Sequence, residues 1–209
     1  MIKATTFYVD STEVTRAEYA AFQAAKAGNV SDQAAECSWN TSYEPQFVQG
    51  APAMTPEQPV TNIDFCDAAA FCAWADKRLC GKIGGGSLAL SELNDWNVSQ
   101  WFVACAGPKG SNPYPYGETY QSGSCNDQTG SQRLEPVGTF AACAGYYPGL
   151  KDMLGNAQEW TDSCDGKAGN ADGCERIGGS YLVTASCGES GLARRDYRAP
   201  ELGFRCCSK

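Results

Sequence analysis

The chain of 209 residues is long enough for one large domain, and its 43% hydrophobic content is ordinary for a globular protein with a buried core. Its formal net charge of -8 at pH 7 argues against nucleic acid and an anionic membrane surface as partners, because both attract clustered lysine and arginine. No stretch is apolar over the length of a membrane-spanning helix. The composition therefore excludes a membrane span and favours cations or neutral partners.

The chain contains 12 cysteines and no histidine. An even number of cysteines is compatible with six disulfide bonds, which predicts an extracellular, periplasmic or outer-surface location. The alternative is a zinc–thiolate site, but no cysteine pair has the CxxC spacing that favours chelation. The lack of histidine excludes Ser-His-Asp and Cys-His catalysis and histidine-bound iron or zinc. No apolar signal region precedes Thr6, so we expect any signal peptide to have been removed.

Three features are predicted in the first 60 residues. The β-favouring residues 6–10 predict a strand. Thr15 and Glu18 have the spacing of a capping box, which predicts a helix of about 12 residues that ends before Gly28. The prolines and polar residues between Ser31 and Pro59 predict an irregular surface segment.

A second helix is predicted to begin after Asp64, a residue type that favours the cap position. One apolar seam follows at helical spacing: Phe65, Ala68, Cys72, Ala75 and Leu79. Cys72 is therefore expected to point inward. Residues 108–149 are rich in glycine, proline, serine and asparagine, which predicts ordered loops that need disulfides for stability. With neither a tandem repeat nor a linker, we expect residues 1–209 to form one α+β domain.

Three strings in the last third of the chain occur in a characteristic order: LGNAQEW at 154–160, GGSYL at 178–182 and LGFRC at 202–206. Together they resemble the closing signature of the formylglycine-generating enzyme (sulfatase-modifying factor, or FGE-sulfatase) superfamily. The strings TEVTRAEYAAF and PVTNIDFCDAAAFCAWADKRL resemble its opening and central elements, with residues 79–100 as an insertion. The resemblance implies a C-type-lectin-like, loop-rich, disulfide-stapled α+β fold. Cysteine-rich relatives of this kind imply a bacterial, secreted branch.

The resemblance also implies a structural calcium site around the first string. Asp152 and Glu159 are expected to supply carboxylate oxygens, and Gly155 and Ala157 to supply backbone carbonyls, which are the hard ligands that calcium prefers. The alternative is a turn in which Asp152 caps the next segment and Glu159 is solvated. A second calcium site is expected near Asn126 and Asp127.

Catalysis in this family depends on two cysteines that follow the Gly-Gly-Ser-Tyr string and bind copper(I) as thiolates. Val183 and Gly188 occupy the two corresponding positions here, and Cys187 lies one residue short of the second. Cys187 is therefore the one candidate catalytic residue, and it is equally suited to be part of a disulfide. We expect no catalysis by the copper mechanism.

The resemblance implies a disulfide between Cys72 and Cys206, in line with the inward position of Cys72. Cys164 and Cys174 flank a polar, glycine-rich loop and are expected to pair locally, which stabilises by roughly 3 kcal/mol in a chain-entropy argument. The partner of Cys105 is left open among Cys125, Cys143 and Cys187.

Residues 181–199 form the expected contact surface, with Tyr181, Val183, Arg194, Arg195 and Arg198 as its named members. Arginine forks bind carboxylates well. The alternative, which we prefer for the arginines, is a set of ion pairs with Glu175, Glu189, Asp196 and Glu201. The leading functional hypothesis is thus an extracellular calcium-stabilised module that binds a protein, peptide or carbohydrate at the cell surface. The competing hypothesis is a divergent copper oxidase that acts on a protein cysteine.

Overall fold

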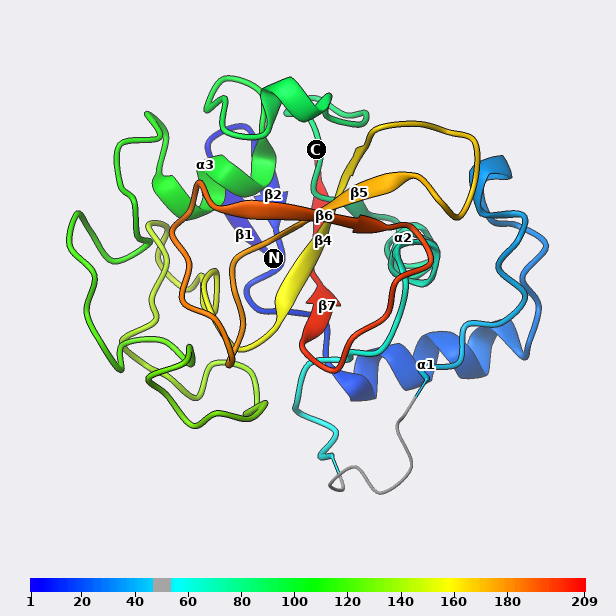
Figure 1. Ribbon diagram of the computed structural model, residues 1–209, viewed down its shortest axis with the longest axis horizontal. Coiled ribbons are helices and arrows are strands. Elements are labelled where there is room, and N and C mark those ends of the chain that lie inside the picture. The colour runs from blue at the N-terminus through cyan, green and yellow to red at the C-terminus, as the bar shows by residue number, and fades with distance from the viewer. Residues whose placement is uncertain (47–53) are drawn as a thin grey trace.

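A computed structural model describes residues 1–46 and 54–209. Part of the segment expected to be irregular, residues 47–53, lies outside the described residues. The described part is a mixed α+β fold in which loops outnumber regular elements, as expected. In the view of Figure 1, α1 (Arg16–Lys26) and α2 (Phe65–Trp74) lie to the right of the strands and α3 (Gln100–Ala106) lies to the left. None of the described helices is long and apolar enough to cross a membrane.

The helix starts are fixed by short-range hydrogen bonds. The backbone N–H of Thr15 donates to the Glu18 carboxylate at 2.8 Å, and the Glu18 N–H donates to the Thr15 hydroxyl at 3.3 Å. Asp64 and Asp67 make the same reciprocal pair at the start of α2. These capping boxes satisfy backbone donors that a helix start leaves free. The predictions of a capped helix ending before Gly28 and of a helix after Asp64 are both confirmed.

The seam predicted for α2 is too long. The helix ends at Trp74, and Leu79 lies instead in β3 (Arg78–Leu79), where it pairs with Cys206. Asp76, two residues past the helix, has a φ of +57°, a left-handed conformation that the helix cannot continue through. Cys72 is fully buried, as expected from the first part of the seam.

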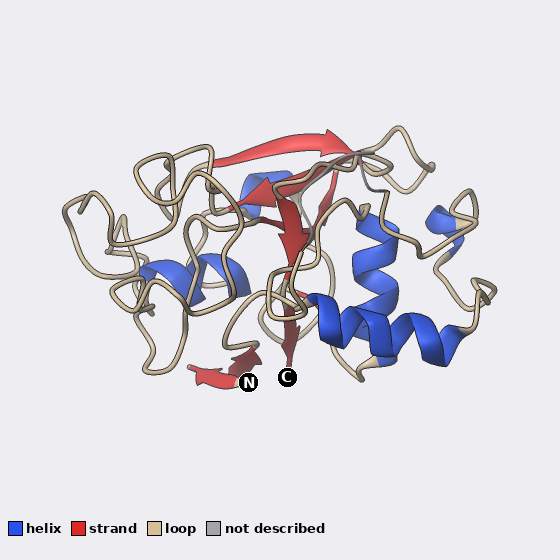
Figure 2. Cartoon of the chain, turned by 90° about the horizontal axis from the view of Figure 1, so that it is seen from below, coloured by secondary structure: helices blue, strands red, loops and turns tan. Residues whose placement is uncertain are grey.

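Two four-stranded sheets organise the chain. The terminal sheet has the order β1-β2-β8-β3, and the central sheet has the order β6-β5-β4-β7. In the terminal sheet, β1 (Ile2–Ala4) and β2 (Phe7–Val9) come from the N-terminus and β8 (Cys206–Ser208) from the C-terminus. Figure 2 accordingly shows the two ends of the chain side by side. The strand expected at 6–10 is β2, and β1 was not anticipated.

The central sheet positions the loops that carry the family signature. It consists of β4 (Gln158–Cys164), β5 (Gly173–Ile177), β6 (Ser190–Arg194) and β7 (Leu202–Phe204). Strand β4 pairs antiparallel with β5 and parallel with β7, so the loops before β4 and after β5 meet at one end of the sheet. Strand β6 pairs only with β5 and forms an edge of the sheet.

Aromatic side chains fill the space between α1, α2 and β7. Tyr19 and Phe22 from α1 lie with ring centroids 5.2 Å apart, and Phe71 of α2 lies 5.3 Å from Phe204 of β7. A second cluster surrounds α3, where Trp101 and Val103 are buried with Met153 and Ile177. Burying each large side chain contributes about 1.5–3 kcal/mol, so these two clusters hold the helices against the sheets.

All twelve cysteines lie in the described residues, and none is free. They form six bonds: Cys37–Cys66, Cys72–Cys206, Cys80–Cys207, Cys105–Cys187, Cys125–Cys143 and Cys164–Cys174. The Cys72–Cys206 and Cys164–Cys174 pairings are the two expected from the sequence. Cys105 pairs with Cys187, one of its three open candidates.

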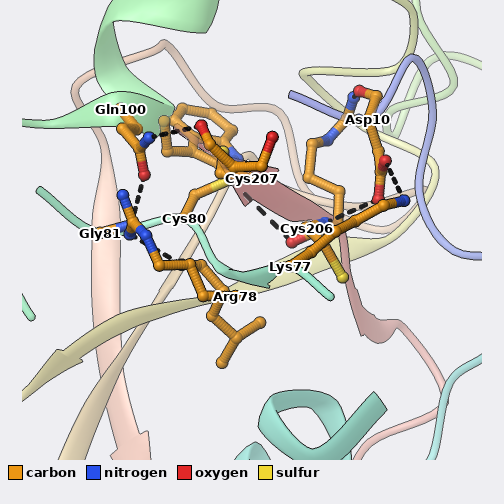
Figure 3. The surroundings of a disulfide bond; sticks show 12 residues. Asp10, Lys77, Arg78, Cys80, Gly81, Gln100, Cys206 and Cys207 are labelled. Atoms are coloured by element: carbon orange, nitrogen blue, oxygen red, sulfur yellow. Dashed lines mark hydrogen bonds and ion pairs between the residues drawn. A yellow bond between two sulfur atoms is a disulfide. The ribbon is translucent and has the colours of Figure 1, made fainter. Parts of the chain in front are cut away.

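Two of these bonds start from adjacent residues of β8. Because side chains alternate across a strand, Cys206 reaches Cys72 on α2 while Cys207 reaches Cys80 on the opposite face. Figure 3 shows the second bond, with Gln100 of α3 donating toward the same strand end. A loop of 134 residues closed in this way stabilises the fold by roughly 5 kcal/mol in a chain-entropy argument. The second bond adds less, because the first already restricts the same loop.

The insertion at 79–100 is a closed loop packed on the central sheet. Lys82 and Ser99 form an isolated bridge at its base, and the Ile83 N–H donates to the Val98 carbonyl at 2.7 Å. Its tip contacts β4, where the Ser163 hydroxyl donates to the Leu88 carbonyl at 3.2 Å. The insertion therefore packs against the second half of β4, and its Asn94 side chain donates to the Gly188 carbonyl at 3.0 Å.

Candidate functional site

The carboxylate of Glu159 is hydrogen-bonded to other protein groups through both of its oxygens. The Arg205 Nε–H donates to both Glu159 oxygens, at 2.8 and 2.9 Å, and the Trp101 indole donates to one of them at 2.8 Å. The Arg205 Nη2 forms an ion pair with Glu159 at 2.8 Å. Both oxygens are thus engaged by N–H donors, and a metal ion bound to either would lie beside the Arg205 guanidinium, a like charge. Glu159 and Arg205 are both fully buried, and this paired arrangement compensates the cost of burying each charge.

Asp152 lies beside this pair and is also bonded within the protein. Its carboxylate accepts from the Gly138 N–H at 2.5 Å, and its backbone carbonyl accepts from the Arg205 Nη2 at 2.8 Å. Gly155 packs against the Asn126 backbone so tightly that an added Cβ would lie 2.5 Å from the Asn126 carbonyl oxygen. Glycine is required there by the close approach of two chain segments.

Glu13 was not anticipated from the sequence, and it lies in the same buried cluster. One of its oxygens accepts from the Ala157 N–H at 3.3 Å, and the other has no hydrogen-bond partner among the described residues. Burial raises the pKa of Glu13 well above its usual range, and the Asp152 carboxylate raises it further. Burial likewise raises the pKa of Asp152 and of Glu159, while Arg205 opposes that rise in both. No local pattern marks Glu13, because its neighbours come from distant parts of the chain.

Of the four residues expected to bind calcium, Asp152 and Glu159 both contact the guanidinium of Arg205, which supplies a cation there. Calcium needs six to eight oxygen ligands, whereas both Glu159 oxygens here face N–H donors and the positive charge of Arg205. As arranged, Asp152, Gly155, Ala157 and Glu159 do not fit a calcium ion. No group of three or more acidic or cysteine side chains arranged to hold a metal occurs among residues 1–46 and 54–209.

The residues expected at a second calcium site are engaged in the same way. The Asn126 amide donates to the Asn156 side chain at 2.9 Å and to the Arg133 carbonyl at 2.8 Å, and its oxygen accepts twice from Ser131. Asp127 accepts from Thr129, Tyr120 and Thr184. These contacts join the loop before β4 to the loop after β5, which indicates a scaffolding role for Asn126.

Val183, the first of the two positions expected for the copper cysteines, lies in a tight turn after β5, and Gly188, the second, lies before β6. Ser180 and Val183 exchange two backbone hydrogen bonds of 3.0 Å, and Gly179 has a φ of +65°. Leu182 and Val183 project outward and are 50% and 56% exposed. Cys187 is buried and bonded to Cys105, so the turn carries no thiol that is free to bind copper.

A cavity of about 390 Å³ lies beside this turn. Its lining includes Leu182, Val183, Arg176, Glu189 and Glu201, from the turn, β5 and the segments that flank β6 and β7. The Arg176 guanidinium donates to Gln158 at 2.7 Å and lies over the Tyr197 ring, which fixes its position at the wall. The cavity combines an exposed apolar lip with charges of both signs.

The arginines of the expected contact surface separate into exposed and buried groups. Arg194 is exposed and pairs with Asp196. Arg195 is 2% exposed and is held by Asp172 and by the carbonyls of Gly166 and Gly169. Arg198 pairs with Asp64 and Asp67 at the start of α2, where burial raises the pKa of Asp67 to about 8.

Ion pairing therefore accounts for these arginines, as we preferred, but mostly with other partners than those expected. Arg195 and Arg198 have no part in the surface around Val183. Tyr181 lies at the base of that surface, where its N–H donates to the Asn156 carbonyl at 3.0 Å.

The chain is thus a loop-rich α+β protein with six disulfides, in which a Gly-Gly-Ser turn borders a cavity at one end of the central sheet, and its fold is of the FGE-sulfatase class. The chain belongs to this family: residues 1–209 match the Sulfatase-modifying factor enzyme 1-like domain over their whole length.

Individual relatives include members named as active and as inactive. The chain is 31% identical over 171 residues to "Inactive C-alpha-formylglycine-generating enzyme 2" of Mus musculus, covering 73% of this chain and 49% of the relative. It is 28% identical to the "Formylglycine-generating enzyme" of Bos taurus, covering 73% and 44%. The chain thus spans about half the length of these curated relatives.

The fold is shared with solved structures. The protein described as CarF superposes with a TM-score of 0.62 at 20% identity, covering 97% of this chain and 85% of the other. This likeness establishes the fold, and the six disulfides indicate an oxidising environment, extracellular or periplasmic.

Proposed function

We propose that this chain is a non-catalytic binding or structural module of the FGE-sulfatase family that acts outside the cytoplasm. One observation carries the proposal: the cysteine nearest to the family's copper position, Cys187, is buried in a disulfide with Cys105, and Val183 stands exposed at the other copper position. Copper(I) binds soft thiolates, and a valine side chain offers no ligand. An inactive relative, so named in mouse, supports the view that members of this family exist without the activity.

The contact surface that we propose is the turn 180–184 with the adjoining cavity. Two neighbouring aliphatic side chains, Leu182 and Val183, are half exposed there, whereas most aliphatic side chains of the fold are buried. A pocket of about 390 Å³ falls within the range typical of ligand sites. The ligand class that fits is a peptide, protein or carbohydrate, which an apolar lip with charged walls accommodates.

The scaffold of this module is held by protein groups. Arg205 supplies the positive charge among Glu13, Asp152 and Glu159. The six disulfides add to the stability of the loop-rich fold. Calcium therefore has no step in the proposed function.

The proposal is tested on the purified oxidised chain by alkylation under non-reducing conditions, mass spectrometry and copper analysis. We expect twelve protected cysteines, no bound copper and no conversion of a cysteine-containing peptide to formylglycine. A free Cys187 together with stoichiometric copper would establish the competing oxidase hypothesis, which requires the Cys105–Cys187 bond to be open.

The contact surface is tested separately on an array of peptides and glycans. Val183→Glu should abolish whatever binding the unaltered chain shows, because it places a charge on the apolar lip. Trp96→Glu is the matched control, since Trp96 is exposed to a similar degree outside the cavity lining. Equal loss in both variants would place the contact surface elsewhere.

A further inference from the structure

A second cavity, of about 410 Å³, lies at the opposite end of β4 from the turn 180–184. Gln158, the first residue of β4, borders the cavity beside Val183, whereas Asp162 and Cys164, near its end, border this one. The two cavities share no lining residue. Nothing in the proposed function uses the second cavity.

One wall of the second cavity is apolar and rigid. Phe65, Ala69 and Ala73 lie along one face of α2 and line it. Cys37 and Cys164 continue this wall, and each is fixed by a disulfide, to Cys66 and to Cys174. A wall built from a helix and two disulfides is formed before any ligand arrives, which lowers the entropic cost of binding.

The other wall gathers charges of both signs around the Asp162 carboxyl. Burial raises the pKa of Asp162, Arg78 and Lys167 lower it, and Glu36 raises it, so all three side chains lie within electrostatic reach of it. Each of these residues lines the cavity. The Arg78 guanidinium is positioned by donating to the carbonyls of Leu79 and Lys82, at 3.3 and 2.6 Å.

The remaining cations of the lining are already neutralised. Lys77 pairs with Asp10 at 2.7 Å and Arg195 pairs with Asp172 at 3.0 Å. By contrast, no ion pair within 4.0 Å forms on Arg78, Lys167, Asp162 or Glu36 within the part of the chain that the structure describes. Ser87 hydrogen-bonds to Asp162, and Arg78 donates to two carbonyls, but neither charge is neutralised by a close ion pair, so the polar wall offers both a cationic and an anionic group to a ligand.

We propose that the second cavity binds a small zwitterion with an apolar side chain, of the class of free aliphatic α-amino acids. The ammonium group lies toward Asp162, the carboxylate lies toward Lys167 and Arg78 at the mouth, and the side chain lies on Phe65, Ala69 and Ala73. A purely anionic ligand leaves Asp162 facing a like charge, and a purely cationic ligand leaves Lys167 and Arg78 unmatched. The zwitterion satisfies both, and this assignment is independent of the proposed function.

Isothermal titration calorimetry on the oxidised chain tests the assignment with L-leucine as the probe. Two analogues isolate the charges: 4-methylpentanoate lacks the ammonium group, and isoamylamine lacks the carboxylate. We expect saturable binding of leucine and at least about tenfold weaker binding of each analogue, since one charge-assisted contact contributes about 1.5–3 kcal/mol. No saturable leucine binding, or equal affinity for either analogue, overturns the proposal.

Variants then locate the bound leucine. Lys167→Ala changes an exposed side chain and should weaken binding about tenfold. Lys109→Ala is the matched control, because Lys109 is exposed and does not line the cavity. Ala69→Phe should fill the apolar wall and abolish binding, and its melting curve reports whether the variant is folded. Leucine binding that survives both Lys167→Ala and a folded Ala69→Phe overturns the assigned place.

Discussion

The loop 152–159 and the segment 180–191 are neighbours in the structure, but they differ in the burial of their side chains. They touch through the Tyr181 N–H, which donates to the Asn156 carbonyl, and the Gly155 N–H donates to the carbonyl of Gly178, two residues before the segment. In the first, Glu159 is buried with both of its oxygens hydrogen-bonded to other protein groups. In the second, Leu182 and Val183 lie open to solvent. The family signature thus contains two separate parts: a buried polar cluster around Glu159, called the sealed support below, and an exposed surface at Leu182 and Val183.

This difference teaches where binding can evolve in such a fold. A saturated, buried polar cluster tolerates little change, because removing one member leaves another charge without a partner. An exposed turn held by a disulfide tolerates changes that alter only its outer side chains.

The largest expected effect comes from breaking the sealed support with Arg205→Leu. This change leaves the buried acids Glu13, Asp152 and Glu159 without their cation, which should cost about 3–5 kcal/mol of unfolding free energy. Denaturant unfolding measures it. The control Arg194→Leu removes an exposed arginine that pairs only with Asp196, and it should have little effect. Similar curves for the two variants would show that the buried cluster does not support the fold.

The next effect concerns the bond that anchors the segment 180–191. The double variant Cys105→Ser with Cys187→Ser opens a loop of 82 residues and should lower the unfolding free energy by about 2–5 kcal/mol. Thermal unfolding under non-reducing conditions measures the loss. The Cys164→Ser, Cys174→Ser double variant opens a loop of only 10 residues and is expected to cost less. A larger loss for the short loop would contradict this ranking.

The contribution of Glu175 to stability is expected to depend on pH. Glu175 lies in β5, next to the edge strand β6. It is buried, one of its oxygens has no hydrogen-bond partner in the described structure, and burial raises its pKa while Thr161 and Ser190 oppose that rise. Because the folded pKa is raised, its contribution to stability is present below the ordinary glutamate pKa and is lost as the pH rises toward the folded value.

Glu175→Gln does not titrate, so its stability relative to the unaltered chain should grow as the pH rises above the ordinary glutamate range. We expect a difference of roughly 1–3 kcal/mol at neutral pH, the cost of an unmatched buried polar group. Unfolding curves at several pH values measure it, and a difference that is constant with pH would show that folding does not raise the pKa of Glu175.

The smallest expected effect is that of calcium. The side chains of Glu159 and Asn126 are hydrogen-bonded to other protein groups. We therefore expect the melting temperature to stay the same whether calcium is added or is removed by a chelator. Differential scanning calorimetry with and without chelator measures this. A calcium-dependent rise that Glu159→Gln removes would show that Arg205 gives way to the ion.

Local signals in the sequence were read correctly where the interaction is local. The capping pairs Thr15–Glu18 and Asp64–Asp67 involve residues three apart, so their hydrogen bonds follow from spacing. The Cys164–Cys174 bond closes a short loop and needed no knowledge of the fold. The end of α2 was misplaced, because Leu79 pairs with Cys206 from the far end of the chain, and that pairing takes it out of the helical seam.

By itself, the sequence determined the family, the α+β fold class and the oxidising environment implied by twelve cysteines, and it predicted the loss of the copper pair at Val183 and Gly188. These depend on residue identity and on spacing along the chain. Only the tertiary structure decided that Arg205 takes the place of a cation beside Glu159, that Cys187 is bonded to Cys105 and that Arg195 is buried. Each of these depends on residues far apart in sequence. Such hydrogen-bond and disulfide partners meet only once the chain has folded.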